Sequence, residues 1–132
     1  MTGQAAYTYT RALGNSLSSS QYLALRLTPR HSIYYRLDWR PGQGWEVTNT
    51  VRYLSKQFQF DGERGQALPA HALWDARIAK SILAAEIYFG LENILDRRYA
   101  ETFDWDPATG GTSRNPHPGR TYSVGASMRF QD

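Results

Sequence analysis

Strict alternation of apolar and polar residues near the end of the chain, over residues 122–130, constrains the fold more than any other feature of the sequence. Every even position of this stretch is apolar, and every odd position is small, polar or charged. Successive side chains of a β-strand point to opposite faces, so the pattern predicts a strand with one apolar and one polar face. Half-buried strands of soluble proteins have the same pattern, so this stretch alone does not identify the environment.

The same alternation occurs in five earlier stretches, at residues 5–12, 31–40, 45–57, 73–81 and 83–93. The chain also holds 9 Tyr, 5 Phe and 4 Trp, and such residues favour sheet over helix. We therefore predict an all-β fold, an antiparallel up-and-down meander of about six strands. The residues expected to share its convex apolar face are Ile33, Tyr35, Trp74, Ile87, Phe89, Val124 and Met128.

The predicted connections alternate between long and short. Long ones cover about 13–27, 59–70 and 94–120, and short ones cover Pro41–Gly44 and about 81–83. Transmembrane β-barrels have tight turns at one end and long loops at the other. Trp39 and Trp45 flank the first short turn, as in the aromatic girdles at membrane interfaces. These features predict a segment of a transmembrane β-barrel, although a soluble sandwich can also present charged residues on a solvent face.

Composition argues against several classes of protein. The net charge of +3 comes from 15 basic and 12 acidic residues that are interspersed, which is a weak case for a nucleic-acid partner. The chain has no Cys, so disulfide frameworks and thiolate metal sites are excluded. The longest strongly apolar run near the middle covers residues 82–85, far short of the ~20 residues of a membrane helix.

Catalytic patterns are also missing from the sequence. Glu86 and Glu92 share a strand face but stand roughly 20 Å apart, too far for a pair of catalytic carboxylates. The glycines around Gln43 lack the third glycine of a dinucleotide loop and predict a turn. The three histidines, at positions 31, 71 and 117, have no metal-ligand spacing, and the acidic residues 104 and 106 lack the next ligand of a calcium loop. We expect neither an enzyme nor a cofactor.

The stretch LENILDRRYAETFDWDPATGGTSRNPHPGRTYSVGASMRF, residues 91–130, resembles the C-terminal end of TonB-dependent outer-membrane receptors. Residues 27–58 and 68–82 are similar to the preceding strands of such barrels, so the resemblance covers nearly the whole chain. The residues that carry the motif are Asn93, Asp96, Tyr99, Pro118, Gly119, Arg120, Tyr122 and Phe130.

These motif residues also have physical interpretations. Asn93 and Asp96 can bond their own backbone where a strand gives way to a loop. Pro118 fixes φ and Gly119 permits a positive φ, so together they end the loop. Arg120 is expected at headgroup depth, where its guanidinium can meet lipid phosphates. The resemblance implies that the outer-membrane assembly machinery reads the terminal strand, including Phe130.

The resemblance implies that residues 1–132 form the C-terminal barrel segment of a receptor whose plug domain and signal peptide are absent from this sequence. It implies the outer membrane of a Gram-negative bacterium and TonB-coupled uptake of a ferric siderophore or similar large nutrient. The implied partners are outer-membrane lipid, TonB, the plug domain, and an iron chelate, haem, cobalamin or glycan as ligand. Two alternatives stay open: a small outer-membrane barrel of another class, and a soluble all-β binding module.

The family places the end of its last strand on the periplasmic side. The loops at 13–27, 59–70 and 96–119 are therefore expected outside the cell, and the two short turns in the periplasm. The third loop is the longest and mixes aromatic with charged residues. Aromatic rings suit a planar chelate and a guanidinium suits an anionic one. The predicted ligand-binding residues are Tyr99, Trp105, Arg114 and His117.

Overall fold

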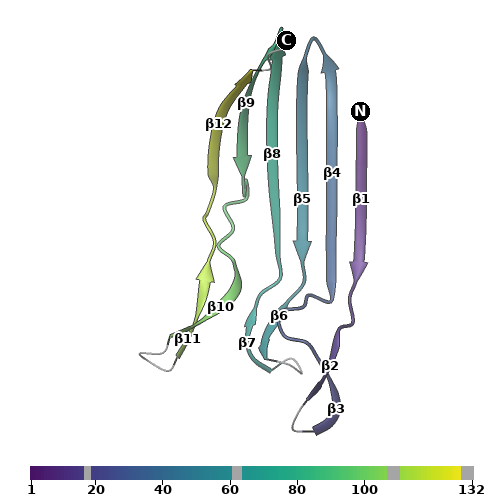
Figure 1. Ribbon diagram of the computed structural model, residues 1–132, viewed down its shortest axis with the longest axis vertical. Helices are drawn as coiled ribbons and strands as arrows, with labels where there is room; N and C mark the ends of the chain where they lie inside the picture. The colour runs from purple at the N-terminus through teal and green to yellow at the C-terminus, as the bar shows by residue number, and fades with distance from the viewer. Residues whose placement is uncertain (17–18, 61–63, 107–110, 129–132) are drawn as a thin grey trace.

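The structure, a computed structural model, describes the 132-residue chain except residues 17–18, 61–63, 107–110 and 129–132. Six of its strands form one antiparallel sheet in the order β1-β4-β5-β8-β9-β12 (Figure 1). Each strand pairs with the next one along the sheet, and β1 and β12 are its two edges. The strands are β1 (Thr2–Tyr9), β4 (His31–Gly42), β5 (Trp45–Leu54), β8 (His71–Ile82), β9 (Ala85–Glu92) and β12 (Thr121–Met128). The prediction of an all-β, six-stranded meander is confirmed.

The three long connections contain strands that the sequence did not predict. Each forms a two-stranded hairpin of its own. All three hairpins lie at one end of the sheet, and the two tight turns lie at the other (Figure 1). The hairpins are β2 (Leu13–Ser16) with β3 (Ser19–Ala24), β6 (Gln57–Phe60) with β7 (Arg64–Leu68), and β10 (Ala100–Asp106) with β11 (Gly111–Pro116). Among the described residues, none belongs to a helix of the length and apolarity that a membrane crossing requires.

Strand register places the apolar residues on one face in rows that cross the sheet. One row runs from Tyr35 through Val51 to Trp74. Directly opposed residues of neighbouring strands point to the same face, so the register confirms the predicted apolar face. A second row holds five apolar residues, Trp39, Val47, Ile78, Phe89 and Val124, and the rows of Ile33, Ile87 and Met128 lie on the same face.

This apolar face has no cover among the described residues. The seven side chains predicted to share it range from 39% exposed at Trp74 to 78% exposed at Val124, and Val47 and Val51 in the middle of the sheet are half-buried. The buried hydrophobic residues are few and mostly small or at the loop end: Leu68, Leu73, Ala79 and Ala100. The described residues therefore form no sandwich with these side chains between two sheets.

The height of the apolar face follows from strand geometry. Along β8 the apolar rows extend from Ile82 to Ala72, about 34 Å at ~3.4 Å per residue. The strand tilt of about 35–45° in membrane barrels reduces this length to a height of about 24–28 Å, close to the ~25 Å of their apolar band. The face is therefore tall enough for a membrane wall.

The two tight turns depend on left-handed backbone positions. Gln43 and Gly44 join β4 to β5 with φ of 51° and 77°. A Cβ on Gly44 would lie 2.5 Å from the Ser81 carbonyl oxygen, so a glycine is required there, and the turn prediction is confirmed. The second turn is residues 83–84 rather than 81–83, and its Leu83 has a φ of 54°.

Candidate functional site

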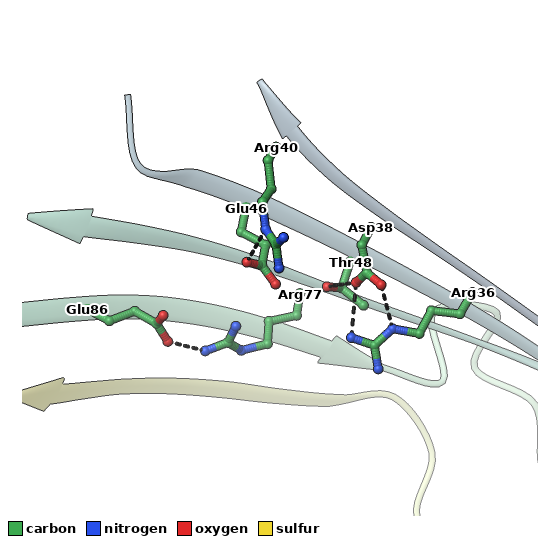
Figure 2. Close-up of polar contacts among 7 residues, drawn as sticks. All are labelled: Arg36, Asp38, Arg40, Glu46, Thr48, Arg77 and Glu86. Carbon is green, nitrogen blue, oxygen red and sulfur yellow. Dashed lines mark hydrogen bonds and ion pairs between the residues drawn. The ribbon is translucent and has the colours of Figure 1, made fainter. Parts of the chain in front are cut away.

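The polar face of the sheet carries ordered ion pairs. Arg36 makes a two-pronged contact with Asp38, at 2.9 and 3.0 Å, and Thr48 Oγ1 donates to the same carboxylate at 2.7 Å (Figure 2). The other pairs on this face are Arg40–Glu46 at 2.9 Å, Arg52–Asp75 at 2.9 Å and Arg77–Glu86 at 2.6 Å. Half-exposed pairs of this kind add little stability each. They make this face suited to water or to a polar partner.

Two polar side chains on the opposite, apolar face have partners within the sheet. Trp74 Nε1 donates to Asn49 Oδ1 at 3.3 Å, which accounts for the one polar exception in the predicted apolar pattern of β5. Lys80 lies at the turn end, where its ammonium donates to the Gln43 carbonyl and lies 4.9 Å from the centre of the Trp45 ring. A cation that reaches along the strand toward an aromatic ring is typical of a membrane interface.

Asn93 organises the junction between β9 and the third long loop. It is 5% exposed and has a φ of 51°. Its side-chain amide makes two hydrogen bonds to the backbone of Arg97. Oδ1 accepts from the Arg97 N–H at 2.9 Å, and Nδ2 donates to the Arg97 carbonyl at 2.9 Å. Its own N–H donates to Asp75 Oδ1 at 2.9 Å, which ties the junction to β8. The predicted backbone bonding of Asn93 is confirmed.

Asp96 connects this junction to the start of β12. Its Oδ1 accepts from the Arg120 N–H at 2.9 Å. Gly119 does not have a positive φ, so that reason for a glycine is wrong. A Cβ at this position would lie 2.7 Å from Asp96 Oδ1, so any other residue would displace that carboxylate. Pro118 contributes its carbonyl, which lies 3.4 Å from Asn93 Nδ2.

Arg120 has a partner inside the chain. Its Nε and Nη2 donate to the Ile94 carbonyl at 3.1 and 2.6 Å. The guanidinium therefore holds the loop that follows β9, whereas the sequence suggested lipid phosphates as its partner. Tyr122 lies on the apolar face, 63% exposed, with its ring centre 6.4 Å from that of Phe89. Phe130 lies outside the described residues.

Three rings stack beside this junction. Tyr99 lies between His71 and His117, and both ring-centre distances are 4.8 Å. His117 Nε2 lies 3.3 Å from Glu101 Oε2, and the His117 N–H donates to the Tyr99 carbonyl at 3.0 Å. Burial raises the pKa of the Tyr99 phenol, and the Glu101 carboxylate raises it further. The stack joins two of the four predicted ligand-binding residues.

The other two predicted ligand-binding residues are not part of the stack. Arg114 Nη2 donates to the Ala67 carbonyl of β7 at 3.1 Å, so it links two hairpins. Trp105 is part of strand β10, but its side chain lies outside the described residues, as do those of its acidic neighbours at 104 and 106. Sequence spacing did not point to His71, because this residue begins β8, far along the chain from the Tyr99 ring on which it stacks.

His71 also lines a small cavity on the polar face. The cavity measures about 180 Å³, and its other charged lining residues are Arg52 and Glu101. The His71 Nε2 atom is buried without a hydrogen-bond partner. In the described part of the chain, no three His, Cys, Asp or Glu side chains gather closely enough to hold a metal ion. The site is therefore a set of aromatic and charged side chains at the loop end of the sheet.

This open sheet with hairpins at one end matches known transport receptors. The ferric-catecholate import receptor Fiu of E. coli K12, in its closed form, superimposes with a TM-score of 0.72 at 19% identity, over 97% of this chain and 19% of that chain. The fold is that of a segment of a TonB-dependent receptor barrel. The ferric citrate transporter FecA, unliganded, matches with a TM-score of 0.69 at 22% identity, over 81% of this chain and 17% of that chain. The copper transporter OprC matches with a TM-score of 0.72 at 19% identity, over 97% and 20%.

The chain spans about a fifth of the length of these receptors. Their likeness confirms the predicted resemblance in fold, and at these identities it concerns the fold alone. No protein-family model and no curated protein matches the chain.

Proposed function

We propose that this chain forms the C-terminal wall of an outer-membrane active-transport receptor, with β4, β5, β8 and β9 at its centre. The observation that carries the proposal is the uncovered apolar face, about 25 Å high, opposite a face of ion pairs. Lipid covers one side of such a wall, and water or a plug domain covers the other. The likeness to import receptors and transporters supports a role in transport rather than in catalysis.

The proposed receptor takes up a ferric siderophore or another large nutrient across the outer membrane of a Gram-negative bacterium, driven by TonB. The neighbours named for ferric catecholate, ferric citrate and copper support a metal or metal chelate as cargo. The hairpins face the outside of the cell, and the two tight turns face the periplasm. Cargo meets the third hairpin, where the Tyr99 stack lies.

Tryptophan quenching tests the membrane wall. Trp39, Trp45 and Trp74 all lie on the apolar face and are 39–50% exposed. In vesicles of brominated phosphatidylcholine their fluorescence should be quenched strongly, and a Trp105→Phe variant removes the fourth tryptophan from the signal. Cooperative, monomeric folding in plain buffer, with no quenching by brominated lipid, would overturn the proposal.

A graft tests the role of the third hairpin. Residues 1–132 would replace the matching strands of an intact receptor, and Tyr99→Ala and Arg114→Gln would be compared with Arg40→Gln, which lies at the turn end. Cargo affinity should fall about five- to tenfold for Tyr99→Ala, since a lost stacking contact is worth about 1–1.4 kcal/mol. Tags at 104–112 should be reachable from outside intact cells. Unreachable tags refute the orientation, and unchanged affinity refutes the ligand role.

A further inference from the structure

A second cleft lies at the loop end of the sheet, on the side of β1 and β4. It measures about 740 Å³. Its walls come from three connections: the one after β1, the one before β4, and the one between β5 and β6. Backbone bonds hold these segments together, since the Thr10 N–H donates to the Arg30 carbonyl at 2.9 Å and the Leu27 N–H donates to the Phe58 carbonyl at 3.0 Å.

The lining of this cleft is basic. Arg11, Arg30 and Lys56 contribute three cations, and His31 adds a titratable ring. None of the described residues in its lining is an Asp or a Glu. The sequence reinforces this bias, because residues 1–37 contain four Arg and no acidic residue. A cleft with this charge favours an anion.

The same cleft opens on the apolar face of the sheet. Tyr9 and His31 are paired across β1 and β4 on the face that carries Ile33, and Tyr9 is 57% exposed. Leu13 and Leu25 add exposed apolar walls, at 43% and 41% exposure. An inorganic anion would leave these leucines in water, whereas an amphiphile would cover them and meet the cations at once. The lining therefore matches a molecule with an anionic head and an apolar body.

We propose that this cleft binds the phosphate-bearing headgroup of a membrane lipid in the leaflet next to the hairpins. Arg11, in the connection after β1, and Lys56, in the connection between β5 and β6, bind the phosphate from two walls of the cleft. The Tyr9 ring and the leucines contact the apolar part of the lipid. The proposal rests on the proposed function, because the apolar face must lie in a membrane for the cleft to reach headgroup depth. It is independent of the cargo and of the Tyr99 stack, which lies on the polar face.

The test uses the full chain folded in neutral detergent micelles. Short-chain phosphatidic acid, the matched diacylglycerol and inorganic phosphate would be titrated separately, with bound lipid counted by native mass spectrometry. Arg11→Gln and Lys56→Gln each remove one charge from the cleft. Arg40→Gln removes the same charge at the opposite end of the sheet, on the polar face, and is the matched control. Circular dichroism would show that each variant keeps its sheet.

Phosphatidic acid should bind at least tenfold more tightly than diacylglycerol. Each cleft variant should weaken its binding about five- to tenfold, a loss of about 1–1.4 kcal/mol, and Arg40→Gln less than about twofold. Equal binding of both lipids, or no effect of either cleft variant, would overturn the inference. Inorganic phosphate that binds as tightly as phosphatidic acid would show an anion site without lipid recognition. A chain that is quenched by brominated lipid but binds phosphatidic acid no more tightly than diacylglycerol refutes this inference alone. A chain that forms no sheet in lipid or micelles refutes the proposed function as well.

Discussion

Substituting alanine for Gly119 should break the link between the third long loop and the last strand of the sheet. An added Cβ would lie 2.7 Å from Asp96 Oδ1, well inside the contact distance of carbon and oxygen. The Asp96 carboxylate accepts the Arg120 N–H at 2.9 Å, so it must turn away and lose this bond. The backbone cannot yield easily, because the Arg120 side chain is held by the Ile94 carbonyl.

The size of the effect follows from two opposing terms. Losing a hydrogen bond to a charged group costs about 1.5–3 kcal/mol. Alanine reduces the conformational freedom of the unfolded chain, which returns about 0.4–1 kcal/mol. The loss is larger, so Gly119→Ala should lower the free energy of unfolding by about 1–2 kcal/mol, a factor of roughly 5–30 in the unfolding constant.

Urea unfolding of the chain in detergent micelles, followed by tryptophan fluorescence, measures this change. Gly3→Ala is the matched control, because a Cβ on Gly3 meets only a Leu37 methyl at 3.9 Å and a backbone oxygen at 4.0 Å. A double-mutant cycle isolates the cause. In an Asp96→Gly background, which keeps the positive φ of 51° at that position accessible, Gly119→Ala should cost nothing or stabilise slightly.

Two results would refute this reasoning. The first is a cost for Gly119→Ala no larger than that for Gly3→Ala. The second is an equal cost with and without the Asp96 side chain, which would mean that Asp96 is not what the new methyl group meets.

Two further predictions concern the turn and the ring stack. Leu83 has a φ of 54° and a fully exposed side chain. Because Asn tolerates left-handed backbone better than Leu does, Leu83→Asn should raise the free energy of unfolding by about 0.5–1 kcal/mol. Ala84→Asn, at a position without positive φ, should not, and equal effects of the two substitutions in urea unfolding would contradict this. Because burial and then Glu101 raise the pKa of Tyr99, the folded state binds the phenol proton more tightly than the unfolded state does. The free energy of unfolding that this shift contributes should be present in full below about pH 10 and should be lost as pH rises through the folded pKa of Tyr99. A Tyr99→Phe variant should lose less stability over that range, and parallel pH profiles of unfolding for both proteins would contradict the prediction.

The main sheet was predictable because its information is local. A period of two can be read from ten residues, and it identified the apolar face from Ile33 to Val124. Strand ends were less predictable. The sequence placed the second turn at 81–83, whereas β8 continues to Ile82 and the turn begins at Leu83. A leucine at a left-handed position carries no turn signal, so composition pointed to the wrong residues.

The hairpins and the junction depend on contacts that the sequence does not display. Strand β11 lacks any apolar alternation, and β10 alternates only over residues 102–106, so their pairing with each other defines them. Asn93 and Asp96 were recognisable as loop-forming residues, but their partners lie up to 25 positions away. The role of Gly119 was predicted wrongly for the same reason. A local turn with positive φ is the usual explanation of a glycine, whereas here the space beside Gly119 is taken by the carboxylate of Asp96, which is distant in sequence.

Under the proposed function, the two edges of the sheet decide how this wall exists in a membrane. β1 and β12 each leave a row of backbone groups without a partner strand among the described residues. In lipid each such group costs several kcal/mol, far more than the ion pairs of the polar face contribute. Because β1 and β12 run in opposite directions, a strand added at either edge continues the antiparallel alternation. The Asp96–Arg120 hydrogen bond lies at the start of β12 and fixes the position of this edge strand. In the proposed membrane wall, pairing of the two edges with further strands therefore contributes more to stability than the ion pairs of the polar face do.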